Sequence, residues 1–270
     1  MSTALSDPVR RRWLAAPLAI WGKLPSHGDF LRHRCSAAQA NDWQNWVGSV
    51  WNQSPLAAPQ ARARRSVRAG TAWLSLEPRK AAPDLGSVPV AFVMQPGALP
   101  FAPDHCVQGV LLASVDQIGR PCPLIIFQQI APGWLRRSWA GKPSAHQTNM
   151  LYWLARIAAR THAANKSWEA LVTAVDSVWQ AHAPGWRQLL GAHQPAPSRQ
   201  QLEALLRNYC EHESADAACG LHGVHRMPWA QWPTHILRTH QPMHAFWQQD
   251  MRGGYVNAGE SLPALWGAQA

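Results

Sequence analysis

Five cysteine and histidine residues lie close together in the C-terminal part of the sequence, and these residue types are the usual ligands of structural zinc. They are Cys210, His212, Cys219, His222 and His225. The set contains enough thiolate and imidazole groups for one tetrahedral Zn²⁺ ion. Its spacing matches no standard zinc finger, however, and three acidic residues between 211 and 216 are typical of a polar loop. We predict no bound metal and no cofactor, and the zinc site stays open as an alternative.

The signature motifs of common enzyme classes do not occur in the sequence. The Gly-Lys pairs at residues 22–23 and 141–142 are followed by Leu or Pro, so neither belongs to a phosphate-binding loop. The sequence has no G-x-S-x-G nucleophile motif and no H-E-x-x-H zinc-protease motif. A hydrolase remains a minor alternative, because a catalytic triad is assembled from residues that are distant in sequence. We therefore predict a protein that is not an enzyme.

Two polar stretches stand out because the packing of a hydrophobic core does not require their residues. Residues 22–30 read G-K-L-P-S-H-G-D-F, and residues 114–123 read S-V-D-Q-I-G-R-P-C-P. Their Gly, Pro and Asp residues are typical of tight turns, in which Asp accepts hydrogen bonds from nearby backbone amides. Such residues on exposed loops can also form a binding surface. The residues alone favour the turn interpretation.

Apolar runs and helical stripes predict the elements that position these stretches. A strand ends near residue 21, and continuous apolar runs at 88–94, 107–114 and 124–130 predict strands covered on both faces. The second polar stretch joins the last two runs, which predicts a long hairpin. Helices are predicted over residues 41–51, over residues 147–164 and after a capping Ser167. Together these elements predict a layered α/β fold.

The chain is basic and rich in tryptophan. It has 25 basic and 15 acidic residues, a net charge of +10, and 16 tryptophans. This charge suits either a nucleic acid or an acidic protein partner. No nucleic-acid-binding motif accompanies the arginine clusters, so we expect a protein partner and no nucleic acid; a basic nucleic-acid-binding protein is the alternative function. Exposed Trp and Arg would supply the anchors of such a contact.

The N-terminal residues resemble a secretion signal only superficially. Three arginines at 10–12 precede an apolar stretch that is short, contains Pro17 and has no small-residue cleavage site. No segment reaches the ~18 consecutive apolar residues of a membrane helix. We expect a cytoplasmic protein with reduced cysteines and no membrane insertion. We also expect a flexible basic segment over residues 1–16 and a single α/β domain over residues 17–270; the sequence does not indicate the oligomeric state.

The two polar stretches resemble signature segments of the TagF family of type VI secretion-associated proteins. The first is similar to a G-K-L-P-x-x-G-D-F signature and the second to an S-x-D-x-x-G-R-x-x-P-L segment. The aromatic residues around 246 are similar, more loosely, to a segment near the family's C-terminal end. Cys122 departs from the pattern, because family members often have a bulky aromatic residue there. The matching residues are Lys23, Pro25, Gly28, Asp29, Phe30, Ser114, Asp116, Gly119, Arg120, Pro123 and Trp247.

The resemblance implies both a fold and a function. The implied fold is a three-layer α/β/α sandwich, for which we expect a mixed central sheet and a helical second half. The implied function is that of a post-translational regulator, a repressor of type VI secretion without catalytic activity. The family is thought to act by binding and sequestering a cytoplasmic forkhead-associated scaffold protein.

We expect Asp29 and Arg120 to come close and lock the two signature stretches together. Each residue lies just outside a predicted strand. A charged group in a loop junction needs a partner, and the loss of one partner of a buried pair costs ~3–5 kcal/mol. The competing interpretation is that these loops form the partner surface.

Overall fold

A seven-stranded antiparallel sheet forms the centre of the computed structural model, which describes residues 7–51, 88–139, 146–191, 197, 199–206, 234–238, 244–249 and 255–267. The strands lie in the order β2-β1-β5-β4-β3-β6-β7. Every neighbouring pair is antiparallel. The bounds are β1 (Ala19–Gly22), β2 (Leu31–His33), β3 (Val90–Met94), β4 (Cys106–Leu112), β5 (Leu124–Ile130), β6 (Ala245–Gln249) and β7 (Tyr255–Gly259).

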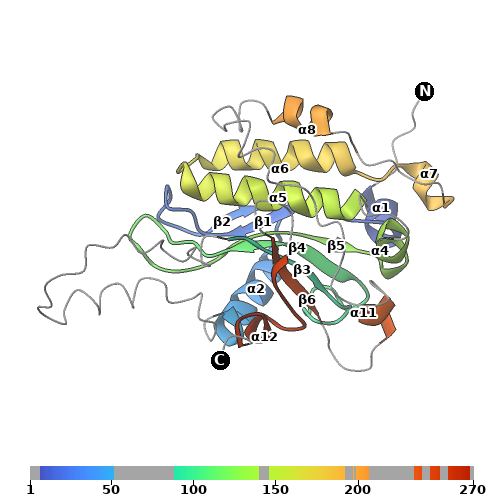
Figure 1. The fold of residues 1–270 in the computed structure, drawn as a ribbon, viewed down its shortest axis with the longest axis horizontal. Helices are drawn as coiled ribbons and strands as arrows, with labels where there is room; N and C mark the ends of the chain where they lie inside the picture. The colour runs from blue at the N-terminus through green and yellow to red at the C-terminus, as the bar shows by residue number, and fades with distance from the viewer. Residues whose placement is uncertain are drawn as a thin grey trace, which may run out of the picture.

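Helices cover both faces of this sheet (Figure 1). One face carries α5 (His146–Ala163) and α6 (Trp168–His182), with α8 (Arg199–Leu205) outside them. The other face carries α2 (Ala37–Ser49) and α12 (Leu262–Gly267). The remaining helices are α1 (Asp7–Trp13), α4 (Pro132–Trp139), α7 (Trp186–Leu189) and α11 (Thr234–Arg238). None of the described helices is both long and apolar enough to cross a membrane.

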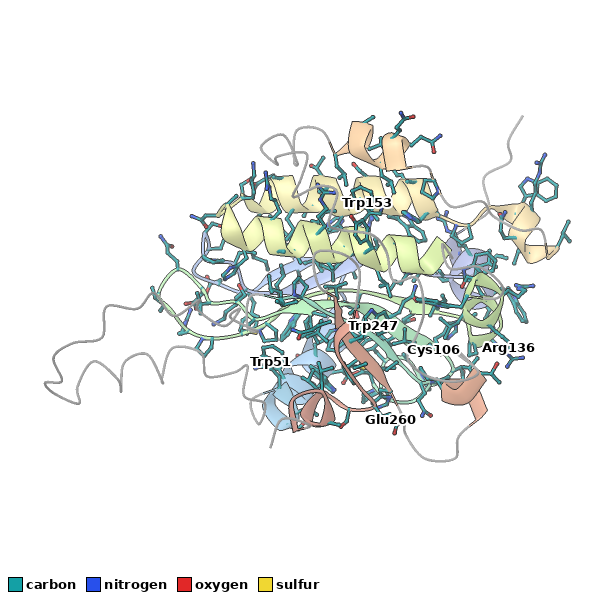
Figure 2. All side chains as sticks on the ribbon, viewed as in Figure 1. Trp51, Cys106, Arg136, Trp153, Trp247 and Glu260 are labelled. Carbon is teal, nitrogen blue, oxygen red and sulfur yellow. The ribbon has the colours of Figure 1, made fainter. Side chains whose placement is uncertain are left out.

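Each face of the sheet packs into its own hydrophobic core. Successive side chains of a strand point to opposite faces, so Val110 of β4 joins the core under α5, while Leu111 joins the core under α2. Figure 2 shows Trp153 on the α5 side of the sheet and Trp51 on the α2 side. The predicted double coverage of the apolar strands is therefore confirmed.

An aromatic cluster fills the core under α2 and depends on a glycine. The ring centroid of Trp43 lies 5.9 Å from that of Phe92 in β3 and 5.2 Å from that of Phe127 in β5. Gly109 of β4 lies between these two phenylalanines in the pairing register. A Cβ atom on Gly109 would lie 2.1 Å from the carbonyl oxygen of Ile126 and 2.9 Å from the Phe92 ring. A side chain at position 109 would therefore displace the cluster.

The predicted helices and the hairpin are confirmed, with shifted ends in some cases. Helix α2 begins four residues earlier than expected, because Ser36 and Gln39 form a capping box at its start. Ser167 caps α6 as predicted, since its side chain accepts a hydrogen bond from the amide of Ala170. β4 and β5 form the expected hairpin. Within the segment 1–16, residues 7–13 form α1, and Leu14 and Ala15 are buried.

The expectation of a mixed sheet is wrong. The sheet is entirely antiparallel rather than mixed, because short connections join β3 to β4 and β4 to β5, and because β6 returns antiparallel beside β3. Helices on both faces bury these strands as completely as they would bury parallel ones. The second half of the chain is largely helical in the described residues, as expected, and it also contributes β6 and β7 to the sheet.

Candidate functional site

The two signature stretches form neighbouring loops because the strands that carry them are paired. β1 pairs with β5, with Trp21 opposite Ile125. The loop that leaves β1, residues 22–30, therefore lies beside the loop that enters β5, residues 113–123. Residues that meet across these loops, such as Lys23 and Asp116, are 93 positions apart in the sequence, and the antiparallel β1–β5 pairing brings them together. We call them the first and second signature loops.

The second signature loop is built around Asp116. The amide of Gly119 donates to the carbonyl of Asp116 (2.9 Å), and the Gly119 backbone has a φ of 83°, which favours glycine. The side chain of Asp116 accepts hydrogen bonds from the amides of Ile118 (3.1 Å) and Arg120 (2.8 Å). The carbonyl of Ser114 accepts from the amide of Cys122 (3.0 Å) and closes the base of the loop. The turn interpretation of this stretch is therefore confirmed.

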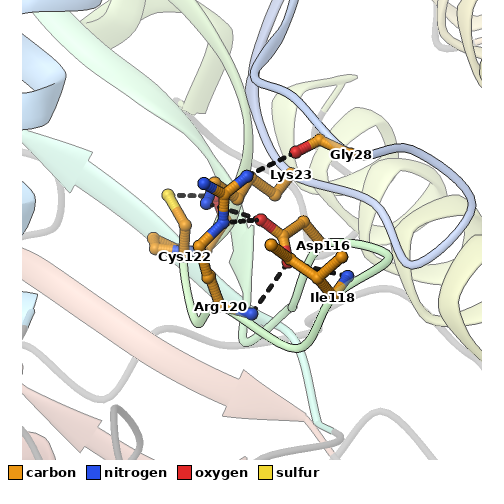
Figure 3. Close-up of polar contacts among 7 residues, drawn as sticks. Lys23, Gly28, Asp116, Ile118, Arg120 and Cys122 are labelled. Carbon is orange, nitrogen blue, oxygen red and sulfur yellow. Dashed lines mark hydrogen bonds and ion pairs between the residues drawn. The ribbon is translucent and has the colours of Figure 1, made fainter.

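A buried carboxylate between two cations joins the loops (Figure 3). The Lys23 ammonium donates to Oδ2 of Asp116 (2.9 Å), and Nε of Arg120 donates to the same oxygen (2.6 Å). The side chains of Asp116 and Lys23 are buried, while that of Arg120 is 55% exposed. Burial alone raises the pKa of Asp116, but the hydrogen bonds from Lys23 and Arg120 outweigh it and hold the pKa well below its usual range.

Further hydrogen bonds fix the loops to each other. The Arg120 Nη2 atom donates to the carbonyl oxygen of Gly28 (2.6 Å), as Figure 3 shows. The amide of Gln117 donates to the carbonyl oxygen of His27 (2.9 Å). With the Lys23–Asp116 pair, these bonds connect both halves of the first loop to the second loop. The acceptors of both bonds are backbone carbonyls of the first loop, so a sequence motif does not identify them.

The predicted pairing of Asp29 with Arg120 is wrong, although Arg120 does lock the loops. Asp29 is exposed, and its carboxylate forms no ion pair with the described residues. Asp116 lies four residues before Arg120 in the same turn, so it is the nearer carboxylate. Arg120 contacts the first loop through the Gly28 carbonyl, next to Asp29 in the chain. The architectural role expected of Asp29 therefore belongs to Asp116.

Gly22 allows β1 to lie directly against the second loop. Its backbone has a φ of 135°, in the region that L-amino acids rarely adopt. A Cβ atom on Gly22 would lie 2.1 Å from the carbonyl oxygen of Pro123 and 2.9 Å from the Cα of Leu124. Both atoms belong to the backbone and cannot rotate away. The glycine that begins the first signature and the proline that ends the second are therefore in direct contact.

Aromatic and apolar side chains surround the charged junction. Phe30 stacks on Trp21 with ring centroids 5.3 Å apart, and the Lys23 ammonium lies 4.8 Å from the Phe30 centroid. Phe30 nevertheless remains 45% exposed, and Ile118 at the tip of the second loop is 71% exposed. Pro25 is partly buried in the first loop. Sequence reasoning missed Trp21, whose contact with Phe30 depends on the turn between them.

Cys122 is a buried thiol at the edge of the junction. Its Sγ atom lies 3.7 Å from the carbonyl oxygen of Pro123. Burial raises the pKa of Cys122 to about 12, with a smaller opposing effect of Lys23. The described cysteines, Cys35, Cys106 and Cys122, are free thiols. At neutral pH Cys122 is therefore a small apolar core residue rather than a nucleophile.

Two sequence-derived candidates lie away from these loops or outside the described residues. Trp247 is fully buried in β6, beyond β5, β4 and β3 from the first loop, and its ring lies 6.4 Å from that of Trp139. It is a core residue, separate from the loop junction. The possible zinc ligands at positions 210, 212, 219, 222 and 225 lie outside the described residues.

Comparison with known protein families identifies the chain. Residues 19–178 match the model of the TagF N-terminal domain, described as type VI secretion system-associated. The chain belongs to the TagF family. Both signature loops lie inside the matched TagF region, whereas Trp247 lies outside it.

Comparisons with individual proteins add little to the TagF assignment. The crystal structure of PA0076 from Pseudomonas aeruginosa PAO1 is similar at 14% sequence identity and a TM-score of 0.34, over 92% of this chain and 91% of that chain. No curated protein matches the sequence.

Proposed function

We propose that this TagF-family chain is a non-enzymatic regulator of type VI secretion. In this proposal it is a cytoplasmic post-translational repressor that binds and sequesters a forkhead-associated scaffold protein of the secretion machine. The observation that carries the proposal is the TagF family match over residues 19–178, which associates the chain with type VI secretion.

The state of the signature residues supports a structural or binding role over acid–base chemistry. The two oxygens of Asp116 accept four hydrogen bonds, from the side chains of Lys23 and Arg120 and from the amides of Ile118 and Arg120. The lowered pKa keeps this carboxylate ionised and a weak base at neutral pH. Lys23 is held by the same carboxylate and is buried. The charges of the motif thus stabilise the loops.

Two measurements test the proposal. The tagged full-length chain is mixed with the purified forkhead-associated type VI secretion protein of the same organism, and the dissociation constant is measured. In cells, the gene is deleted or overexpressed while release of secreted type VI proteins is followed. We expect direct binding, higher secretion after deletion and lower secretion after overexpression. Binding without any change in secretion would contradict repression, and absence of binding would contradict sequestration.

Nucleic-acid binding is the second candidate, and the net charge of +10 favours it. Its test is the binding of a short DNA duplex at increasing salt concentration. A phosphate-binding protein loses affinity steeply as salt rises, because bound counterions are released on association. Tight binding with a steep salt dependence, together with failure to bind the scaffold protein, would favour this candidate.

A further inference from the structure

Exposed apolar side chains gather on the helices at one end of the molecule. Seven large apolar residues are exposed in the described part of the chain, and four of them belong to α1, to α7 or to the residue that follows α7. Trp13 is 61% exposed and Trp186 is 41% exposed. Single exposed apolar residues are ordinary on a protein surface, but a group that includes two tryptophans is a sign of a contact surface.

The same helices carry a concentration of positive charge. The sequences of α1, α4 and α7 contain six arginines and one acidic residue, Asp7. Arg12 lies over the ring of Trp13, at 5.9 Å from its centroid, and Arg187 lies over Trp186, at 5.6 Å. A guanidinium that stacks on an aromatic ring keeps its in-plane N–H groups available for a carboxylate. Each pair therefore places a guanidinium beside an exposed tryptophan ring, where both can contact an acidic partner.

Contacts along the chain place these helices at one end of the fold. The amide of Ala131 donates to the carbonyl of Leu14 (2.8 Å), which joins the end of α1 to the start of α4. Arg10 of α1 lies 5.5 Å from the ring centroid of Trp179, in the last turns of α6, and α7 follows shortly after α6. Figure 1 shows α1, α4 and α7 at the same end of the sheet, and Figure 2 places Arg136 there.

We propose that this end, which we call the arginine–tryptophan surface, binds an acidic surface of the protein partner. It is defined by Arg12, Trp13, Arg136, Arg137, Trp186 and Arg187. The inference rests on the proposed function, because it names the surface by which the chain holds the forkhead-associated protein. Trp and Arg are the residue types most enriched among binding hot spots, and carboxylates of the partner would complement the excess of arginine.

Besides Asp7 of α1, a further negative charge lies close to this surface. Asp104 is exposed on the loop beside α1, where the ring of the adjacent His105 contacts the carbonyls of Arg11 and Arg12. Asp104 forms no ion pair within the described residues, so it offsets a single positive charge. The excess of arginine remains, and it selects for an acidic rather than a basic partner.

The test compares charge reversal on this surface with the same change elsewhere. Arg136→Glu with Arg137→Glu alters α4, and Trp186→Ala with Arg187→Glu alters α7. Arg32→Glu is the control, because Arg32 is an exposed arginine of β2, outside the three helices. The dissociation constant of each full-length variant for the purified forkhead-associated protein is measured by calorimetry. Thermal unfolding of each variant checks that it is folded.

We expect each double variant to bind at least about tenfold more weakly, and Arg32→Glu to bind within about threefold of the wild type. We also expect wild-type affinity to fall as salt is raised, and to fall less in the double variants. If both double variants bind with wild-type affinity, the assignment of this surface as the binding surface is overturned, while the proposed function stays intact. If the wild-type chain does not bind the purified scaffold protein, the proposed function and this inference fail together.

A nucleic acid is the other possible occupant of a basic surface with exposed tryptophans. The same variants are therefore tested against a DNA duplex of about 20 base pairs, in the absence of the protein partner. Loss of DNA binding in the double variants, with unchanged binding of the scaffold protein, would overturn the inference. Loss of scaffold binding in the double variants, with no measurable DNA binding by the wild-type chain, would support it.

Discussion

Replacing Gly22 by alanine tests whether the two signature loops are held by direct backbone contact. The added methyl group would lie 2.1 Å from the carbonyl oxygen of Pro123, and the backbone would have to keep a φ of 135° or change it. Either response moves the end of β1 away from the start of β5. We therefore expect Gly22→Ala to be among the most destabilising single methyl additions in this chain.

The expected change in the free energy of unfolding is the sum of two destabilising effects and one stabilising effect. A non-glycine residue in this backbone region costs ~1–3 kcal/mol. Insertion of a methyl group where the neighbours cannot move costs another ~1–3 kcal/mol. Alanine also lowers the conformational entropy of the unfolded chain, which stabilises the folded state by ~0.4–1 kcal/mol. We expect a net loss of about 3 kcal/mol in the free energy of unfolding, a large share of the ~5–15 kcal/mol that stabilises a typical domain.

Urea unfolding followed by tryptophan fluorescence measures this loss. In thermal unfolding it corresponds to a decrease of roughly 6–12 °C in Tm, at about 2–4 °C per kcal/mol. Gly48→Ala is the matched control, because Gly48 lies in α2 with no neighbouring atom within 4 Å of a built Cβ. We expect this control to gain ~0.5–1 kcal/mol, since alanine favours the helix. A Gly22→Ala chain as stable as the control would refute the reasoning.

Three other perturbations have defined outcomes. Gly109→Ala brings a methyl group 2.1 Å from the β5 backbone, and we expect ~1–3 kcal/mol of destabilisation with a weaker near-ultraviolet circular dichroism signal from the aromatic cluster. Asp116 has a lowered pKa in the folded state, so its stabilising effect is present above its ordinary value of 3.8 and is lost as the pH falls further. Asp116→Asn should therefore be less stable than wild type at pH 7, with a difference that shrinks in urea titrations below about pH 4. Burial raises the pKa values of Cys106 and Cys122 to about 12, so peptide mapping after iodoacetamide treatment at pH 8 should find both thiols modified only in the unfolded chain.

The strongest local signals predicted the centre of the fold well. β5 has the predicted bounds because Pro123 precedes its apolar run and Pro132 follows it closely. α6 was predicted by its capping Ser167 and its apolar stripe. α2 was placed too late because its first residues, Ala37 and Ala38, carry no large apolar side chain, and the stripe begins only with the tryptophans.

The edges of the sheet could not be predicted from local pattern. β2 has only three residues, and its sequence Leu-Arg-His is compatible with a loop. β6 and β7 are short and contain polar residues such as Gln248 and Asn257, and their strand conformation depends on pairing with each other and with β3. The β3–β6 pairing joins residues about 160 positions apart, so a window of neighbouring residues does not contain it.

The location of the candidate site was predicted from the sequence, but its hydrogen bonds and ion pairs were not. The two signature stretches were identified as turns, and they meet in the structure through the β1–β5 pairing. The choice of Asp116 over Asp29 as the partner of Arg120 was not predicted. Both carboxylates lie in loops rich in turn-forming residues, and the backbone path of each loop decides which one is buried.

The strand order also determines the sequence in which the sheet can be completed during synthesis. Strands β1 to β5 form a continuous set from residue 19 to residue 130, whereas β6 pairs with β3 across about 160 positions, as in Val90 with Gln248. Until β6 leaves the ribosome, β3 is an open edge of five apolar residues. A chain that stalls or is cleaved before residue 245 would expose that edge to other chains. Pairing of β6 with β3 covers the edge and so reduces the tendency of this protein to aggregate.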